Sequence, residues 1–477
     1  MDKSVKIAII DNGINELLLA KKLEKCVTVD EKGICIADTK KIDQQQFQHG
    51  TNCALIIEKY CPDCALSSIR ILDENGKGGV TSFQPALDWC YKNHILLVNL
   101  SLGTIDFRDC DKLRCLINEY VAKGMIIIAA TANSGFVSYP ASFTNVIGVA
   151  TTDSPLDYCK DYMQMGIDTV VPSVHAIEVY DVEMITSLSN SYAAPYISAL
   201  IANKLNEDST LDIKKLKIYA GEQSQLQMIK GIYEPDWIYR AYVLGRGKAS
   251  RADYYFETVL GKFEEIHEEI DTVIAFSMSD LENLKIGNKN IIYLGKEDIF
   301  DINVQGFFWS KESRLRQILE NHYQGNGLDV PIVILATDDT VDSFYILTEL
   351  KRAFASGGYN AYTVGMEPEC VLYGLEYMPK PSSDYGIWKK FIESQVFYKQ
   401  SDLVIWCMPI DDKEELLKLY PDYDVKINVY NNGENMLVQL SIEGERTDKK
   451  ISGMIDRKDV EEIYHVIEKK LTEDENG

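Results

Sequence analysis

The chain has 477 residues, 46% of them hydrophobic, a composition typical of a globular protein with sizeable cores. Its formal net charge of −24 disfavours nucleic acid and anionic membranes as partners, because both bind basic surfaces. No stretch reaches the roughly 18 apolar residues of a membrane span. The first apolar run, residues 7–10, ends at Asp11 and is too short for a secretory signal. We therefore expect two or three domains and a cytoplasmic location.

The chain contains 11 cysteines, and nine of them precede residue 160. In a reducing cytosol such residues are more often thiols than a disulfide framework. Cys61 and Cys64 have C-x-x-C spacing, but no second cysteine pair or histidine follows at the spacing of a four-ligand zinc site. We expect neither a metal site nor a redox role there.

The first ~200 residues alternate short apolar runs with amphipathic segments. This alternation predicts a parallel sheet covered by helices on both faces. Ligands bind such sheets beyond the carboxyl ends of the strands, where Asp11, Ser101 and Asn133 fall. The expected strands are 5–10, 65–72, 95–103, 125–132 and 145–152, and the expected helices are 51–61, 82–93 and 111–124.

Residues 206–255 are charged and aromatic without a clear strand, and we interpret them as a helical connector. A second α/β region follows, with expected strands at 271–279, 289–296, 331–337, 360–365 and 401–409. Helices are expected at 263–270 and 343–358, and an amphipathic helix with an acidic tail at 456–477. The predicted domains are 1–205, 206–255 and 256–477, the last with a possible division near residue 326.

Three polar residues of the first region stand at element boundaries. Asp11 follows the first strand, His49 precedes Gly50 and a helix, and Ser191 begins a helix rich in small residues. Each has a plain structural interpretation, as a turn residue, a helix-start histidine and a helix cap. Pro195 is expected in the first helical turn, where its missing N–H costs least. The order Asp, His, Ser is also one of the three known orders of a catalytic triad.

Six segments then resemble those of the subtilisin-like serine peptidases, over roughly residues 4–205. I-I-D-N-G-I is similar to that family's D-x-G, and H-G-T-N-C-A to its H-G-T-x-x-A. V-N-L-S-L-G is similar to its N-x-S-x-G, and A-A-T-A-N-S-G to its A-A-G-N-x-G. S-Y-P-A-S is similar to the run that follows, and N-S-Y-A-A-P to its T-S-x-A-x-P. Six matches in the family's order identify the region as a member.

The resemblance implies a role for each matched residue. Ser191 would be the nucleophile, His49 its general base, and Asp11 the residue that holds the imidazole tautomer. Asn133 and the backbone N–H of Ser191 would donate to the oxyanion. An extended substrate would pair with Ser101, Leu102 and Gly103, and the S1 walls would include Ala130, Thr131, Ala132 and Ser134.

Three departures from the family pattern concern the fit of the nucleophile turn and of the S1 wall. Ser189 and Asn190 stand where the family usually has Gly-Thr, Tyr196 where it has His, and Ala132 where it has Gly. None of them removes a triad atom. An active peptidase and an inactive, peptide-binding member of the fold therefore both stay open.

Two further expectations follow from the resemblance. Many secreted members carry a calcium-binding loop between the histidine helix and the next strand, whereas residues 49–72 run on without one. The sequence also starts at the first core strand, so we expect no N-terminal prodomain. We predict no stabilising calcium, no other metal and no cofactor.

Residues 331–358 have the strand–loop–helix order of a P-loop. Aligned on Ser343, residues 336–343 read A-T-D-D-T-V-D-S, without the glycines and the lysine that cradle phosphate. Asp338, Asp339 and Asp342 would repel phosphate, so a nucleotide is disfavoured. A nucleotide-binding regulator is one hypothesis for the function of the chain, and the sequence of this loop disfavours it.

Residues 362–379 and 401–409 resemble parts of degenerate P-loop-like domains in peptide maturation system proteins. The fold class predicted for the whole chain is α/β: a subtilisin-like three-layer domain with a parallel sheet, followed by a P-loop-like, degenerate region. The predicted function is a cytoplasmic serine endopeptidase that forms an acyl-enzyme, and one candidate substrate is the leader of a ribosomally made, modified peptide. The alternative is an inactive peptide-binding subunit of such a system.

Overall fold

The structure, a computed structural model, divides into two compact units, Met1–Tyr239 and Arg240–Gly477. It describes residues 4–39, 48–152, 159–180, 182–226, 233–245, 247–259, 266–282, 284–325, 327–380, 385–412, 423–431, 436–442, 445–451 and 453–473.

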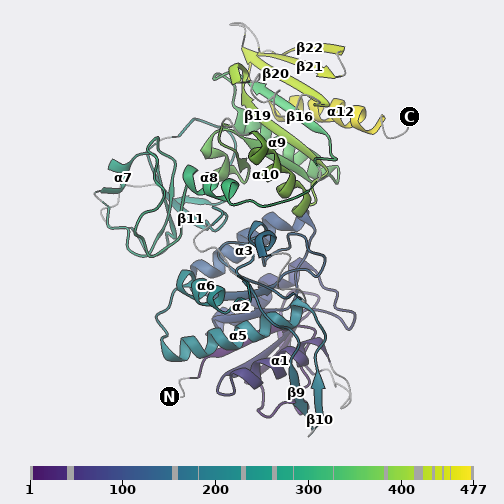
Figure 1. The fold of residues 1–477 in the computed structure, drawn as a ribbon, viewed down its shortest axis with the longest axis vertical. Coiled ribbons are helices and arrows are strands. Elements are labelled where there is room, and N and C mark those ends of the chain that lie inside the picture. The colour runs from purple at the N-terminus through teal and green to yellow at the C-terminus, as the bar shows by residue number, and fades with distance from the viewer. Residues whose placement is uncertain are drawn as a thin grey trace. The chain divides into compact units, whose positions relative to one another are not determined.

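The first unit contains ten strands and six α-helices among its described residues (Figure 1). The strands are β1 (Lys6–Asp11), β2 (Lys25–Val29), β3 (Cys35–Ala37), β4 (Ala65–Arg70), β5 (Leu97–Leu100), β6 (Ile126–Ala130), β7 (Ile147–Ala150), β8 (Thr169–Val170), β9 (Ala176–Val179) and β10 (Val182–Ile185). The helices are α1 (His49–Tyr60), α2 (Phe83–Lys92), α3 (Cys110–Ala122), α4 (Cys159–Gln164), α5 (Asn190–Glu207) and α6 (Ile213–Glu222). Short 3₁₀ turns are η1 (Glu16–Leu18), η2 (Val80–Ser82) and η3 (Phe107–Asp109).

Eight of these strands form one sheet in the order β3-β2-β4-β1-β5-β6-β7-β8. All neighbours are parallel except β2 and β3. Every strand and helix predicted for the first 200 residues is present. The sequence analysis did not predict β2, β3, β8 or the β9–β10 hairpin, which are short and carry little of the continuous apolar pattern of a central strand.

Buried side chains of α1 and α5 cluster with Ile7 and Ile9 of β1, which alternate along the strand with Ala8 and Ile10 on its other face. No residue of α2 or α3, both of which are described in full, belongs to this cluster, and these two helices pack on each other. Helices α1 and α5 pack on each other, and both contact β1. The same cluster of buried residues joins α1, α5 and α6 to the sheet through Ile9, Ile57, Ile128, Ile197 and Leu216, among other residues.

The segment 206–255, expected to be a helical connector, contains a strand as well as a helix. Helix α6 lies within it, and β11 (Arg240–Leu244) then begins the second unit. Leu244 and its neighbours gave no strand signal because the run R-A-Y-V-L is short and flanked by charged and glycine residues. The predicted domain boundaries stay predictions, and the proposed division near residue 326 falls between α8 and β16, at a residue outside the described ones.

The described residues of the second unit form two sheets. The elements are β11, β12 (Glu257–Val259), β13 (Thr272–Ala275), α7 (Met278–Glu282), β14 (Asn290–Tyr293), β15 (Phe308–Ser310), α8 (Lys311–Leu319), β16 (Ile332–Thr337), α9 (Ser343–Ser356), β17 (Ala361–Gly365), η4 (Pro368–Tyr373), β18 (Glu376–Tyr377), α10 (Tyr385–Tyr398), β19 (Leu403–Pro409), η5 (Ile410–Asp412), β20 (Val425–Asn431), β21 (Met436–Ile442), β22 (Glu445–Ile451) and α12 (Arg457–Glu473). One sheet has the order β12-β11-β13-β14-β15 and is parallel throughout.

The other sheet has the order β18-β17-β19-β16-β20-β21-β22, in which the pairs β20–β21 and β21–β22 are antiparallel and the other pairs are parallel. The strands predicted at 331–337, 360–365 and 401–409 are β16, β17 and β19. The second unit is thus a mostly parallel α/β region, as expected.

One helix prediction in this unit is wrong among the described residues. Residues 266–270, part of the expected helix 263–270, form a loop and a turn around His267. Ile270 is buried and Ile266 packs on a core cluster of this unit, so tertiary packing rather than the helical spacing of these residues decides their conformation. The expected acidic tail beyond α12 lies outside the described residues. Among the helices of the described segments, none is both long and apolar enough to cross a bilayer.

Candidate active site

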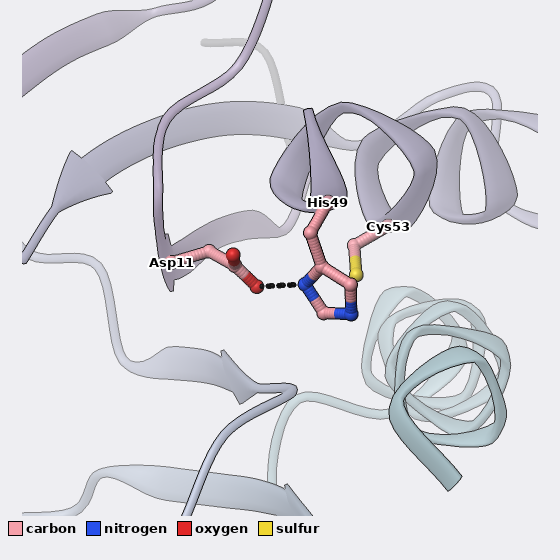
Figure 2. Close-up of side chains that lie close together, drawn as sticks. All are labelled: Asp11, His49 and Cys53. Atoms are coloured by element: carbon pink, nitrogen blue, oxygen red, sulfur yellow. Dashed lines mark hydrogen bonds and ion pairs between the residues drawn. The ribbon is translucent and has the colours of Figure 1, made fainter. Parts of the chain in front are cut away.

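The end of β1 places a buried carboxylate beside the start of α1. Asp11 is 1% exposed, and its Oδ1 accepts a hydrogen bond from the backbone N–H of Asn12 at 2.7 Å. Its Oδ2 lies 2.8 Å from Nδ1 of His49, the first residue of α1 (Figure 2). A carboxylate oxygen only accepts, so Nδ1 of His49 carries a proton and Nε2 is left to accept another.

Two glycines allow this close approach. Gly13 has φ +104°, a conformation that favours glycine, and it turns the chain directly after Asp11 and Asn12. A Cβ on Gly50 would lie 2.6 Å from the carbonyl oxygen of Gly13. The side chain of Asn12 then accepts from the N–H of Gly50 at 3.1 Å, which satisfies one free N–H of the first turn of α1. The H-G pair at the start of α1 is therefore required by packing as well as by chemistry.

Asp11 also sets the charge state of His49. Burial opposes protonation of the ring, but the hydrogen bond and the negative charge of Asp11 outweigh it and raise the pKa of His49. The pair therefore stabilises an imidazolium. A general base needs such stabilisation after it has taken a proton.

Ser191 is the second residue of α5, and the cap of that helix is another serine. Ser189 is the N-cap, and its hydroxyl oxygen accepts from the N–H of Ser191 at 3.4 Å. The plain interpretation of Ser191 as a cap is therefore wrong, because that position belongs to Ser189. The side chain of Ser191 is free of capping duty and half-buried at the start of α5.

Pro195 lies deeper in α5 than the sequence analysis expected. It is the sixth helical residue rather than a member of the first turn. A proline there removes the donor to the carbonyl of Ser191, four residues earlier. The thiol of Cys53 on α1 lies 3.8 Å from this carbonyl oxygen and supplies a weak donor instead. Packing of α1 on α5 thus tolerates the proline beside the candidate nucleophile.

Asn190, one of the departures from the family pattern, ties the nucleophile turn to two strand ends. Its Oδ1 accepts from the N–H of Thr151 at 2.7 Å, and its Nδ2 donates to the carbonyl of Ala132 at 3.1 Å. Both partners follow strands of the main sheet, β7 and β6. The substitution therefore holds the start of α5 against the sheet rather than loosening it.

Asn133 also contacts the start of α5, and its side chain is exposed. Its Oδ1 accepts from the N–H of Asn190 at 3.0 Å, and its Nδ2 donates to the hydroxyl of Ser189 at 3.3 Å. The structure thus brings Asn133 to the N-terminus of α5, beside the backbone N–H of Ser191. Both N–H groups assigned to the oxyanion from sequence reach the same side-chain oxygen.

Cys53 adds a third possible metal ligand beside Asp11 and His49, as Figure 2 shows. One ligand atom of each residue lies within 4.8 Å of the other two, which would suit a soft ion such as Zn²⁺. Burial, and then the charge of Asp11, raise the pKa of Cys53 well above its ordinary value, so the thiol is protonated. An ion bound there would take one nitrogen of the His49 ring as a ligand.

The contacts of two aromatic residues near His49 and α5, Tyr192 and His175, were not predicted from the sequence. The ring of Tyr192 stacks on His49, with centroids 5.4 Å apart and planes inclined by 28°. Its hydroxyl accepts from Nδ2 of Asn52, on the same helix as His49, at 3.1 Å. His175, which lies outside the motifs, has its Nε2 3.2 Å from the carbonyl of Tyr192 and its Nδ1 3.1 Å from the hydroxyl of Tyr60. The sequence around these residues shows only the spacing of apolar positions, which does not predict these contacts.

The predicted substrate edge follows β5. Ser101 is buried, and its hydroxyl accepts from Nδ2 of Asn99 at 3.1 Å, so its side chain points into the core. Leu102 is half-buried and Gly103 is exposed. A Cβ on Gly103 would lie 2.8 Å from the carbonyl of Tyr139, with which Thr104 pairs through two backbone hydrogen bonds. Glycine thus allows residues 103–104 to run close to residue 139.

The predicted S1 residues lie at the end of β6 in different surroundings. Ala130 is buried, Ala132 is half-buried and Ser134 is exposed. Thr131 is buried, and its hydroxyl pairs with that of Ser138 at 3.1 Å, so its side chain is not an exposed wall. Ser138 also accepts from the N–H of Ala132 at 2.9 Å, which holds this segment in place.

Comparison with known proteins bears on the first unit. A family model described as "Subtilase family" matches residues 2–218. The chain is 26% identical over 215 residues to the minor extracellular protease Epr of Bacillus subtilis (strain 168), an alignment that covers 42% of this chain and 32% of the relative. It is 29% identical over 160 residues to subtilisin BL of Lederbergia lenta, covering 32% and 59%. It is 30% identical over 145 residues to the M-protease of Shouchella clausii (strain KSM-K16), covering 30% and 38%. The chain thus spans about one third to three fifths of the length of these relatives.

Proposed function

Residues 2–218 belong to the subtilase family, and from this premise we propose that the protein is a serine endopeptidase. The observation that carries the proposal is the hydrogen bond of 2.8 Å between the buried carboxylate of Asp11 and Nδ1 of His49. It leaves Nε2 of His49 as the acceptor for the proton of a nucleophile. Ser191, at the start of a helix packed on α1, is the serine that the family motif assigns to that role.

In the proposed reaction, Ser191 Oγ attacks the scissile carbonyl and His49 takes its proton. The imidazolium is stabilised by Asp11 and then protonates the leaving amine. Asn133 and the N–H of Ser191 donate to the oxyanion of the tetrahedral intermediate. The resulting acyl-enzyme is hydrolysed by water, which His49 activates in the same way.

Labelling of the purified full chain with a fluorophosphonate probe tests this function. We expect stoichiometric labelling of the protein and none of Ser191→Ala. A folded wild-type protein that does not react, alone or with candidate peptides, would favour the alternative, an inactive peptide-binding subunit. The melting temperature of each protein serves as the control for folding.

We also propose that the enzyme acts in the cytoplasm. Cys53, Cys61, Cys64 and Cys90 of the first unit are buried thiols that form no disulfide. Free thiols are typical of a reducing compartment. Cell fractionation with an antibody to the chain would test the location, and recovery from the medium would contradict it.

We propose that the second unit binds a precursor peptide, and that its larger sheet is a degenerate form of a P-loop-like sheet. The carboxyl ends of β16, β17 and β19 line a cleft together with the start of α9, the usual ligand position of such sheets. Asp338, Asp339 and Glu367 line it with a single cation, Lys248, so a polyphosphate is disfavoured. This composition supports a peptide ligand over a nucleotide.

Calorimetric titration of full-length Ser191→Ala, which cannot cleave, separates these ligands. We expect binding of candidate precursor peptides and no binding of ATP with magnesium. Micromolar binding of ATP would contradict the degenerate assignment and favour a nucleotide-regulated protein.

A further inference from the structure

The two N–H groups proposed to stabilise the oxyanion converge on one oxygen of the protein itself. Nδ2 of Asn133 lies 3.3 Å from Oγ of Ser189, and the backbone N of Ser191 lies 3.4 Å from the same oxygen. An oxyanion site is defined by donors that reach a common point. The hydroxyl of Ser189 therefore takes the hydrogen bonds that a reacting carbonyl needs.

The orientation of the Asn133 amide follows from its neighbours. The backbone N–H of Asn190 can only donate, and it lies 3.0 Å from Asn133, so the amide oxygen must face it. The NH₂ group then points towards Ser189. The other donor is equally fixed, because the N–H of Ser191 belongs to the first turn of α5 and has no carbonyl partner within the helix.

The backbone of Ser189 is also held in place. It has extended angles, φ −162° and ψ 138°, and its N–H donates to the hydroxyl of Ser173 at 3.1 Å. Its Cβ is therefore fixed at the mouth of the helix, and only rotation about χ1 can move its hydroxyl. The family pattern has glycine at this position, and glycine has no oxygen to offer the two donors.

We propose that Ser189 is a positioning residue that occupies the oxyanion hole in the resting protein, so that its hydroxyl must rotate away before a substrate carbonyl can enter. This inference rests on the proposed function of the site. It adds a property that the triad does not have, namely a gate built from the cap of the nucleophile helix.

The distances explain how such a gate can open. Both bonds to Ser189 are longer than the usual 2.9–3.0 Å of an N–H···O bond, and both join neutral groups. Hydrogen bonds to a charged oxygen are about twice as strong as neutral ones. The oxyanion of the tetrahedral intermediate therefore outcompetes the hydroxyl, whereas the neutral ground-state carbonyl competes on equal terms. Displacement of the hydroxyl is a cost that the free protein pays before either oxygen can bind, so the gate lowers the second-order rate of reaction.

Replacement of Ser189 tests the gate. Glycine removes the oxygen while it remains an acceptable N-cap, so α5 is preserved. Threonine keeps the oxygen and serves as the matched control. We expect the fluorophosphonate labelling rate of Ser189→Gly to rise about fivefold to tenfold, which corresponds to relief of roughly one net hydrogen bond, and that of Ser189→Thr to stay at or below the wild-type rate.

A double-mutant cycle separates the gate from a general structural effect. In the Asn133→Ala background one of the two donors is absent, so the gain from Ser189→Gly should shrink. A merely structural role of Ser189 would change the melting temperature and leave the gain in rate equal in both backgrounds.

The outcomes are distinct. A faster Ser189→Gly with a slow Ser189→Thr supports the gate, most strongly if the wild type is almost unreactive. A slower Ser189→Gly overturns it and makes the hydroxyl a third donor to the oxyanion. An unchanged rate with labelling still abolished in Ser191→Ala also overturns the gate, while the peptidase stands. No labelling of the wild type, Ser189→Gly or Ser191→Ala overturns both the gate and the proposed function.

Discussion

Replacement of Asp11 by asparagine would reverse the proton arrangement of the site. The N–H of Asn12 donates to Oδ1 of Asp11 at 2.7 Å and would require an oxygen at that place in the variant. The new amide NH₂ would then take the position of Oδ2, 2.8 Å from Nδ1 of His49. An NH₂ group only donates, so Nδ1 must accept and the ring proton must move to Nε2. That tautomer cannot accept the proton of Ser191.

The size of the effect follows from the burial of the pair. Asp11 is 1% exposed, so water cannot replace its negative charge. We expect kcat to fall by about 10⁴-fold, the loss that accompanies the wrong tautomer in a serine triad. The fold should survive, because the amide has the same shape as the carboxylate and keeps the bond from Asn12.

The pH dependence gives an independent measure of the same pair. The raised pKa of His49 means that activity rises as the pH rises through a value above about 6.5, where the free base forms. Without the charge of Asp11, burial alone remains and the midpoint should fall below that value. A raised pKa stabilises the fold below the unfolded pKa, and this stabilisation is lost as the pH rises through the folded value. The stability advantage of the wild type over Asp11→Asn should therefore shrink towards alkaline pH.

The assay is the rate of fluorophosphonate labelling between pH 5 and 9, with thermal unfolding of both proteins at each pH. Asp11→Asn that labels within tenfold of the wild type, or that keeps the wild-type midpoint, would refute the tautomer argument. Equal loss of labelling and of folding would show that Asp11 acts on stability instead.

Three other predictions concern neighbouring groups. Tyr192→Leu removes the ring stacked on His49 and should lower kcat about tenfold with little change in KM, since one aromatic contact contributes about 1 kcal/mol. Tyr192→Phe keeps the ring and should keep most activity. Equal rates of the wild type and Tyr192→Leu would exclude a positioning role. Zinc should inhibit labelling by binding between Asp11, His49 and Cys53. Inhibition of Cys53→Ser should require at least about tenfold more zinc, because a thiolate ligand is lost. Equal sensitivity of both proteins to zinc would place the ion elsewhere. Helix α1 continues into β4 through residues 61–64 without a longer loop, so calcium or a chelator should leave the melting temperature unchanged, and a large shift would reveal a site that the sequence analysis excluded.

The central elements were predictable because their signals are local. Buried parallel strands are continuous apolar runs, and a polar residue directly after such a run falls at the sheet edge where ligands bind. Asp11 ends such a run and Asn133 lies three residues beyond β6, whereas His49 begins a helix and was found through its motif alone. Strand β11 and the β9–β10 hairpin escaped prediction because a short strand depends on its neighbours in the sheet rather than on its own pattern.

The residues that were hardest to interpret act through contacts distant in the sequence. Asn190 holds Thr151 and Ala132, which lie 39 and 58 positions away, and no pattern around residue 190 reveals them. Pro195 looked acceptable only in a first turn, because the thiol that substitutes for its missing donor belongs to another helix. Asn190, a departure from the family motif, and Pro195, which belongs to it, are thus both accommodated by partners from elsewhere in the unit.

Ser189 differs from Asn190 in what its side chain contacts. Asn190 holds the start of α5 to the sheet, whereas Ser189 adds an acceptor at the point where the proposed reaction needs two free donors. A helix cap and an oxyanion site both use the first N–H groups of a helix, so one serine cannot cap α5 through Ser191 and leave that N–H free. The hydroxyl of Ser189 thus stabilises the start of α5 and, by the same hydrogen bond, occupies a donor that the oxyanion would need. Ser189→Gly should shift that balance towards reactivity at little cost in stability.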